Sequence, residues 1–366
     1  MWIAIFTVVG ALAIAGIFFL ITRFHRFRCL EQLAERHKLL SWVLAAVPVA
    51  ALLCTYFINL FTMFVVVIHC MFIWIVCDFI AWIVRKCRKT ARTRNYAGGA
   101  ALLLTAAVLG AGWFFAHHIF AKPYTFRTEK DLGGKPLRIV AIADSHLGIT
   151  LDGAKFAALT DRIQAENPDA VVICGDFVDD DSTKADMLAA CRSLGGLQTP
   201  YGVYYIYGNH DVGYFRYRDF TAEDLRNALT DNGVVMLSDE SVLLDDRFYL
   251  TGRLDRTFEE RKSAQELTES LDPDKYTVML DHQPNDYAAE AESGADLVIS
   301  GHTHGGHIFP AGQIGLAIGA NDRIYGTETR GDTTFLVTSG VSGWAIPFKT
   351  GTISEYCVID IVPLHE

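Results

Sequence analysis

The stretch LVISGHTH at residues 297–304 sets a short apolar run, Leu297–Ser300, directly before a glycine and two histidines. Short apolar runs bounded by glycine are typical of buried β-strands. His302 and His304 would then stand just past the end of a strand, where an open α/β sheet delivers side chains to a common rim. The stretch therefore predicts two candidate ligand residues at the edge of a sheet.

The same pattern, an expected strand followed by polar residues, recurs at four places upstream. The strands are Leu137–Ala143, Ala170–Cys174, Gly202–Tyr207 and Thr277–Leu280. In the same order, the polar residues are Asp144 and His146, then Asp176 and Asp179, then Asn209, His210 and Asp211, then His282. Each piece alone is weak, because a Gly-Asp pair is usually a turn and an isolated histidine is more often packed than a ligand. Five such pieces in one order favour a shared site.

Further elements fill the spaces between these pieces. Strands are expected at Phe248–Thr251, Thr334–Thr338 and Tyr356–Ile361, and helices at Ala154–Ala165 and Ala222–Thr230. Strands that alternate with helices predict the α/β fold class for this part of the chain.

The chemistry of the polar residues indicates metal binding. Imidazole and carboxylate ligands together suit Mn, Zn or Fe far better than Ca or Mg alone. Asp176 can bridge two ions about 3.5–4 Å apart, and the preceding Gly175 permits an unusual backbone angle. Asn209 adds a neutral carbonyl oxygen. The set predicts two divalent transition-metal ions, with Mn, Zn and Fe all open.

These motifs carry a resemblance to a known family. The series D-x-H, G-D-x-x-D, G-N-H-[DE], H and G-H-x-H stands here as Asp144-Ser145-His146, Gly175-Asp176-Phe177-Val178-Asp179, Gly208-Asn209-His210-Asp211, His282 and Gly301-His302-Thr303-His304. Through this series of motifs, residues 136–366 resemble the calcineurin-like metallophosphoesterase superfamily. The sequence Gly-His-Thr-His-Gly-Gly, followed by Pro310, looks like its bacterial branch of membrane-associated phosphodiesterases and lipid-precursor pyrophosphatases. The resemblance implies a four-layer α/β/β/α sandwich.

The resemblance also implies a role for each motif residue. The first metal would be held by Asp144, His146, Asp176 and His304, and the second by Asp176, Asn209, His282 and His302. His210 would face the substrate phosphate, with Asp211 behind it orienting the imidazole. Asp179 would support the ligands without binding a metal itself. Arg253, Asp255 and the Ser342–Phe348 stretch are further candidates for the rim of the site.

The implied activity is hydrolysis of a phosphodiester or pyrophosphate bond by a metal-bridging hydroxide, with a lipid-linked phosphate ester among the candidate substrates. One alternative is a membrane signalling or binding module that reuses the fold, although such a protein would more often have lost ligands. Another is a scaffold with a structural metal. Seven ligand residues shared between two ions leave room for water, which disfavours the scaffold.

The first third of the chain has a different texture. Hydrophobic residues make up 51% of the chain beside 20% charged residues, and almost the whole apolar excess precedes residue 121. Segments long enough to cross a ~30 Å hydrocarbon layer are expected at about residues 2–22, 39–58, 61–84 and 97–120. A signal peptide at the start is disfavoured, because basic residues follow the apolar stretch instead of preceding it. We expect a transmembrane helical domain at 1–120, a juxtamembrane linker at 121–135 and the phosphoesterase domain at 136–366.

The basic residues of the loops predict the orientation of a multi-pass cell-membrane protein. The loop between the first two spans holds Arg23, Arg26, Arg28, Arg36 and Lys38, and the loop between the last two holds Arg85, Lys86, Arg88, Lys89, Arg92 and Arg94. Basic loops face the cytoplasm, so the catalytic domain should be extracytoplasmic. Asp78, inside the third span, is either a functional carboxylate or one that reaches the interface or pairs with Arg85.

The remaining features concern partners. The expected partners are the lipid bilayer and a phosphate-ester substrate. The segment Tyr214–Tyr217 is either a contact for a lipid tail of that substrate or an ordinary surface or core segment. No nucleic acid is expected, because the chain has a net charge of −10 and a pI of about 5.6. The eight cysteines contain no C-x-x-C pair, so no zinc finger is expected. Three cysteines, an odd number, lie in the polar part of the chain, and one of them, Cys174, lies in an expected strand, so no disulfide framework is expected.

Overall fold

The computed structural model describes residues 2–89, 95–213 and 218–364. Arg92 and Arg94 of the second basic loop, and the segment Tyr214–Tyr217, lie outside the described residues. The chain divides into two compact units, a helical unit of residues 1–112 and an α/β unit of residues 113–366. Each unit is described by itself.

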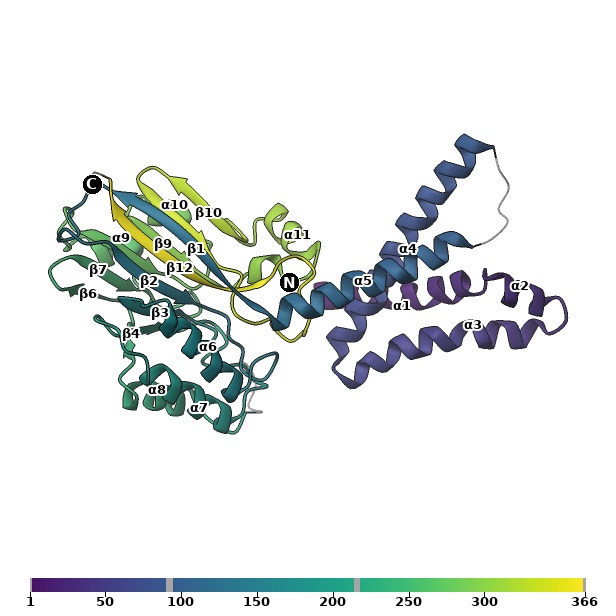
Figure 1. The fold of residues 1–366 in the computed structure, drawn as a ribbon, viewed down its shortest axis with the longest axis horizontal. Coiled ribbons are helices and arrows are strands. Elements are labelled where there is room, and N and C mark those ends of the chain that lie inside the picture. The colour runs from purple at the N-terminus through teal and green to yellow at the C-terminus, as the bar shows by residue number, and fades with distance from the viewer. Residues whose placement is uncertain (1, 90–94, 214–217, 365–366) are drawn as a thin grey trace. The chain divides into compact units, whose positions relative to one another are not determined.

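The helical unit contains the predicted apolar helices (Figure 1). Its elements are α1 (Trp2–Phe24), α2 (Arg28–Ala34), α3 (Lys38–Leu53), the 3-10 turn η1 (Cys54–Phe57), α4 (Leu60–Arg88) and α5 (Tyr96–His117), whose last turns belong to the α/β unit. Within the described residues, four stretches are long and apolar enough to cross a membrane: 7–24, 38–57, 60–88 and 96–117. The prediction of four such helices is confirmed.

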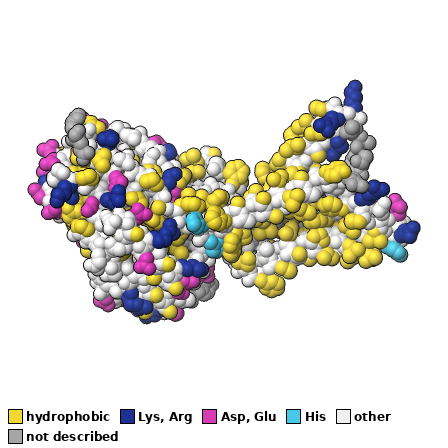
Figure 2. Space-filling view, in the orientation of Figure 1, with side chains coloured by type: hydrophobic (Ala, Val, Ile, Leu, Met, Phe, Trp, Pro, Cys, Tyr) yellow, Lys and Arg dark blue, Asp and Glu magenta, His cyan; other side chains and the backbone are white. Residues whose placement is uncertain are grey.

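The helical unit has a small buried core. Leu20, Val49, Val67 and Trp74 form part of one buried cluster, whereas most large apolar side chains of these helices face outward. Figure 2 shows the resulting apolar surface along the helices. Such a surface is typical of helices that face lipid, because water would not cover it favourably.

Asp78 has a partner that the sequence did not indicate. Its Oδ2 lies 3.0 Å from Nε of Arg23 and 3.6 Å from Nη1 of Arg26. The pairing residues come from α1 and the turn after it, not from Arg85 on the same helix. Asp78 therefore ties α4 to the end of α1.

The α/β unit contains two six-stranded sheets. The strand order of the first sheet is β1 (Ile119–Thr128), β12 (Ser354–Pro363), β2 (Leu137–Ile142), β3 (Ala170–Cys174), β4 (Val203–Ile206) and β5 (Val235–Met236). The order of the second is β10 (Gly326–Arg330), β11 (Thr333–Val337), β9 (Leu297–Ser300), β8 (Tyr276–Leu280), β7 (Phe248–Gly252) and β6 (Glu240–Leu244). Strands β2 to β5 are parallel to one another, and so are β7, β8, β9 and β11.

Helices complete the layers. The first sheet is covered by α6 (Gly153–Ala165), α7 (Lys184–Gly195) and α8 (Ala222–Asp231), and the second by α9 (Ala264–Thr268) and α10 (Tyr287–Ala291). The turn η2 (His304–Gly306) and α11 (Ala311–Ala317) follow β9. The predicted four-layer α/β/β/α fold is confirmed (Figure 1).

Strand β2 shows why the layers form. Its side chains alternate between two faces, as in any strand. Leu137 and Ile139 enter the core between the two sheets, and Val140 and Ile142 enter the core under the helices. A strand buried on both faces reads as a nearly continuous apolar run, and Arg138 is the one polar residue in β2.

The segment expected as a linker differs from that expectation. Residues 119–128 form β1, which pairs in parallel with β12 along its whole length, from Ile119 opposite Ser354 to Thr128 opposite Pro363. Helix α5 ends at His117, before the expected end of the span at residue 120. One residue, His118, therefore separates the helix from the edge of the sheet, and a linker is left only at 129–135.

Candidate metal centre

The predicted ligand residues lie at the carboxyl ends of five strands. Strands β2, β3 and β4 deliver them from the first sheet, and β8 and β9 from the second. In the part of the chain that the structure describes, three groups have ligand atoms within 4.8 Å of one another: Asp144, His146 and His304; Asp176, His282 and His302; and His146, Asp179 and His210. The first two groups contain three of the four residues in each implied ligand set.

Asn209 lies in the turn after β4 and is buried, with 4% of its surface exposed. The next residue, His210, donates its backbone N–H to Asp176 Oδ1 at 2.8 Å. This contact fixes the turn of Asn209 against the carboxylate predicted to bridge the two ions. The structure thus brings all ten predicted residues, including Asp179 and Asp211, into one region.

The backbone at the ligands is unusual. The φ angles of Asp144, His146, Asp176, His302 and His304 are 54°, 36°, 52°, 69° and 48°. Non-glycine residues avoid this left-handed region, at a cost of roughly 1–3 kcal/mol each, and such strain gathers at functional sites. Five strained residues at one rim indicate that the fold holds these side chains in place against local preference.

Gly175 makes the close approach of two turns possible. Its φ is 79°, and a Cβ added there would lie 2.5 Å from the backbone nitrogen of Gly208 and 2.8 Å from Nδ1 of His282. A side chain at this position would push apart the turns that carry Asp176 and Asn209. The expectation of a special backbone angle at Gly175 is met.

Hydrogen bonds fix the orientation of three imidazoles. Nδ1 of His146 donates to Asp179 Oδ2 at 3.0 Å, Nδ1 of His282 to the Cys174 carbonyl at 2.7 Å, and Nδ1 of His304 to the Ser342 carbonyl at 3.2 Å. Because each partner is an acceptor, the hydrogen of a neutral ring sits on Nδ1 and the lone pair on Nε2. Metal-binding histidines are commonly held in this way.

The Nε2 atoms of two of these imidazoles lie near one carboxylate. Nε2 of His282 lies 3.1 Å from Asp176 Oδ2, and Nε2 of His146 lies 3.6 Å from the same oxygen. Among the described residues, neither Nε2 atom has a hydrogen-bond partner, although both are buried. Lone pairs that converge with carboxylate oxygens fit a cation between them. The residues present therefore suit the metal ions of the sequence prediction.

The electrostatics agree with this fit. Burial lowers the pKa of His302 to about 4, and burial lowers that of His304 well below its ordinary value. Burial raises the pKa of Asp144 to about 6. Burial would also raise the pKa of Asp176, but the charges of His282, His210 and His146 bring it well below normal. Burial would lower the pKa values of His146 and His282, but Asp179 beside the first ring and Asp176 beside the second raise them. Because metals bind neutral imidazole and ionised carboxylate, ion binding at these two rings would release protons.

Comparison with known proteins follows this geometry. The family profile for the calcineurin-like phosphoesterases matches residues 137–306. An uncharacterized metallophosphoesterase of Aquifex aeolicus is 32% identical over 219 residues, which cover 57% of this chain and 79% of that protein. The chain belongs to the calcineurin-like phosphoesterase family.

Two further relatives show similar levels of identity. An uncharacterized metallophosphoesterase of Helicobacter pylori J99 is 29% identical over 268 residues, 71% of this chain and 70% of that protein. A bovine protein described as a transmembrane protein with metallophosphoesterase domain is 29% identical over 240 residues, 60% of this chain and 51% of that protein.

One expected role within the phosphoesterase site is corrected. Nδ1 of His210 contacts Asp179 Oδ1 at 3.1 Å, so Asp179 orients the imidazole. The carboxylate of Asp211 instead accepts backbone N–H groups of Asp176, Phe177, Val178 and Gly208, at 2.7–3.2 Å. Asp211 is fully buried, and its oxygens are occupied by the two ligand-bearing turns that it joins.

Asp179 therefore holds two imidazoles at once. One of its oxygens faces His146 and the other faces His210. Burial would raise the pKa of Asp179, but the hydrogen bonds and charges of the two histidines lower it below its ordinary value. Its carboxylate links a predicted metal ligand to the predicted substrate-facing residue.

The sequence did not single out Lys349. Its Nζ is buried and donates to the carbonyls of Ser339, Gly340 and Ile353 at 2.6, 3.2 and 3.3 Å. The same loop supplies the Ser342 carbonyl to His304. A lone lysine in a loop carries no sequence signal of burial, so only the folded loop reveals this role.

Two expected rim positions do lie beside the ligands. The Trp344 ring lies 5.5 Å from that of His210, in the Ser342–Phe348 stretch. Asp255 is fully buried and accepts two hydrogen bonds from the Gln283 side chain, at 3.0 and 2.8 Å, next to His282.

Proposed function

We propose that this chain is a membrane-anchored phosphoesterase that uses two divalent transition-metal ions to hydrolyse a phosphodiester or pyrophosphate bond. The proposed ligands are those of the two implied sets: Asp144, His146, Asp176, Asn209, His282, His302 and His304. The observation that carries the proposal is the pair of buried, unpartnered Nε2 atoms of His146 and His282 that face Asp176.

The chemistry divides between the ions and the protein. When bound, such ions lower the pKa of water toward ~7 and neutralise charge on phosphoryl oxygens. His210 is the imidazole that can reach substrate, since its side chain is 13% exposed, whereas those of His146 and His282 are fully buried. Held by Asp179 through Nδ1, the ring would act in its imidazolium form, in which Nε2–H would stabilise a phosphoryl oxygen or protonate the leaving oxygen.

The surface near the site supports a lipid-linked substrate. After His304, residues 308–321 contain no Asp, Glu, Lys or Arg, and Phe309, Ile314, Leu316 and Ile318 are 44–63% exposed. Exposed apolar patches of this kind mark binding surfaces. Together with the four candidate spans, this segment favours a substrate with an acyl or prenyl tail. The basic loops favour an extracytoplasmic catalytic unit.

The test is turnover by the full-length chain in detergent with Mn²⁺ and bis-p-nitrophenyl phosphate. We expect activity that a chelator removes and that Asp176→Ala lowers by at least about a thousandfold, because the bridging oxygen is lost. Asp161→Asn, an exposed carboxylate on α6, is the matched control and should keep full activity. A folded protein that binds Mn²⁺ without hydrolysing this substrate or a pyrophosphate diester would favour the binding-module alternative.

A further inference from the structure

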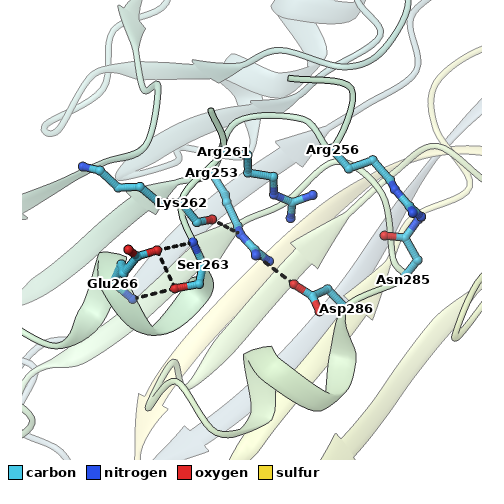
Figure 3. Close-up of a pocket in the computed structure, with 8 residues that line it drawn as sticks. All are labelled: Arg253, Arg256, Arg261, Lys262, Ser263, Glu266, Asn285 and Asp286. Carbon is cyan, nitrogen blue, oxygen red and sulfur yellow. Dashed lines mark hydrogen bonds and ion pairs between the residues drawn. The ribbon is translucent and has the colours of Figure 1, made fainter. Parts of the chain in front are cut away.

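The loop after β7 forms a basic pocket beside the metal centre. The pocket has a volume of about 540 Å³ and is lined by Arg253, Arg256, Arg261, Lys262, Ser263, Glu266, Asn285 and Asp286. Figure 3 shows these side chains, six of which come from the single stretch 253–266. Neither the metal ligands nor the residues proposed to act on the substrate belong to this set.

The two acidic residues of the pocket are already engaged. Glu266 Oε2 accepts hydrogen bonds from the backbone N–H and the hydroxyl of Ser263, at 2.8 and 2.7 Å, and so caps α9. Asp286 lies 2.8 Å from Nη2 of Arg253. Neither carboxylate is left to neutralise the remaining cations.

The arginines divide into one that holds the fold and two that can take a ligand. Arg253 is 5% exposed and pairs with Asp281, Asp286 and Glu290. Arg261 is 10% exposed; it pairs with Asp281 through Nη2, but its buried Nε has no hydrogen-bond partner among the described residues. Arg256 is exposed, and the described part of the chain places no ion pair on it. Donors of Arg256 and Arg261 are therefore available at the pocket.

The pocket and the metal centre share the loop after β8. Arg253 donates its backbone N–H to the Leu280 carbonyl at 3.0 Å, so the loop after β7 runs beside the loop after β8. Asp281, the partner of Arg253 and Arg261, directly precedes His282, and Asn285 follows it by three residues. The loop after β8 thus lines the pocket and also carries the proposed metal ligand His282. Asp255, which directly precedes Arg256, accepts hydrogen bonds from Gln283, the residue after His282.

We propose that this pocket binds a second phosphate group of the substrate while the metal centre acts on the first. The inference rests on the proposed function and narrows it to substrates with two phosphate groups, either in a pyrophosphate linkage or on one headgroup. Arginine forks match phosphate oxygens in a bidentate way. The two arginines would form charge-assisted hydrogen bonds with a group that a simple phosphodiester lacks.

Two substrates that differ by one phosphate test the proposal: bis-p-nitrophenyl phosphate and P1,P2-bis(p-nitrophenyl) pyrophosphate. With the full-length chain and Mn²⁺, we expect kcat/KM for the pyrophosphate diester to exceed that for the phosphate diester at least tenfold. Arg256→Glu should reduce this preference at least tenfold, and Arg256→Lys should reduce it less. Arg261→Lys keeps a charge beside Asp281 and should also reduce it, because the guanidinium fork is lost.

The outcomes separate the two levels of the proposal. Arg192→Ala, an exposed arginine on α7, should leave the preference unchanged. Turnover of both substrates with no preference, or a preference that survives Arg256→Glu, overturns the second-phosphate site and leaves the phosphoesterase proposal standing. No turnover of either substrate overturns the phosphoesterase. Orthophosphate inhibition that Arg256→Glu relieves, without any substrate preference, would mean that the pocket holds a free ion, and this too overturns the proposal.

Discussion

The helical unit and the α/β unit contain similar apolar side chains but turn them in opposite directions. Leu39, Phe72 and Phe79 of the helical unit are 80%, 53% and 58% exposed, whereas Leu137 and Ile139 of β2 are fully buried. Exposing apolar area to water costs roughly 25 cal/mol per Å², so the first arrangement is stable only in a lipid environment. The contrast in exposure indicates that the helical unit suits a lipid environment and the α/β unit suits water.

The units also treat carboxylates differently. Asp211 in the α/β unit is fully buried and accepts four backbone N–H groups. Asp78 in the helical unit is 25% exposed and pairs with two arginine side chains. A saturated buried acceptor joins backbone segments, while a partly exposed pair only joins side chains. The two residues should therefore differ in what their loss costs.

Asp211→Asn should produce the largest effect. The amide nitrogen would face backbone N–H groups that have no other acceptor, which should cost about 3 kcal/mol of unfolding free energy. The turns of Asp176 and Asn209 would shift, and turnover should fall about a hundredfold or more. Thermal unfolding in detergent and bis-p-nitrophenyl phosphate hydrolysis measure the two effects.

Asp78→Asn is the matched substitution in the helical unit. It should cost about 1 kcal/mol or less and leave turnover within about twofold. An Asp78→Asn variant that loses as much stability as Asp211→Asn would break the comparison, since the exposed pair would then matter as much as the buried acceptor.

Lys349 should give a smaller effect that depends on pH. Burial lowers its pKa from 10.5 to about 7. Between these values the unfolded chain binds a proton that the folded chain does not, so the contribution of Lys349 to stability rises with pH through this window. Below pH 7 the folded protein bears the full cost of charging the buried amine.

Lys349→Met removes this titration. The unfolding free energy of the wild type, relative to the variant, should rise by about 2 kcal/mol between pH 7 and 9. Thermal unfolding at both pH values, with the metal removed from both proteins, measures the difference. A constant difference across this range would show that Lys349 keeps its charge in the folded state.

The substitution with the smallest expected effect tests on which side of the membrane the α/β unit lies. It should leave the free energy of unfolding and the turnover almost unchanged. Asp246→Cys places a thiol where the side chain is 83% exposed. A membrane-impermeant maleimide should label it from outside intact cells if the α/β unit is extracytoplasmic. Cys29 and Cys87, exposed near the basic loops, should react only after lysis. Labelling of Cys29 and Cys87, but not of Asp246→Cys, in intact cells would reverse the proposed orientation.

The local sequence pattern was sufficient to predict the strands that lead to the site. Apolar runs such as Leu137–Ile142 and Leu297–Ser300 are buried on both faces, so their composition alone separates them from the loops that follow. The polar residues after these strands could be grouped for the same reason, because parallel strands end at one edge. The four apolar helices were equally visible from length and hydropathy.

Long-range pairing was not visible. Strand β1 alternates weakly and finds its partner, Ser354–Pro363, more than 200 residues later, so nothing local distinguished it from a linker. The exchange of roles between Asp179 and Asp211 depends on where backbone N–H groups point, which no motif encodes. The basic pocket arises only when the loop after β7 folds beside that after β8.

The entry of the chain into the first sheet has a mechanical consequence. Helix α5 passes through a single residue into β1, which is registered with β12 over ten residue pairs. A force on the chain at His118, directed along β1, would pull β1 parallel to its neighbour and load the whole ladder in shear, because the bonds of a parallel pair are evenly spaced along both strands. The hydrogen bonds between β1 and β12 would therefore share the load and break together, and would not break one after another from one end.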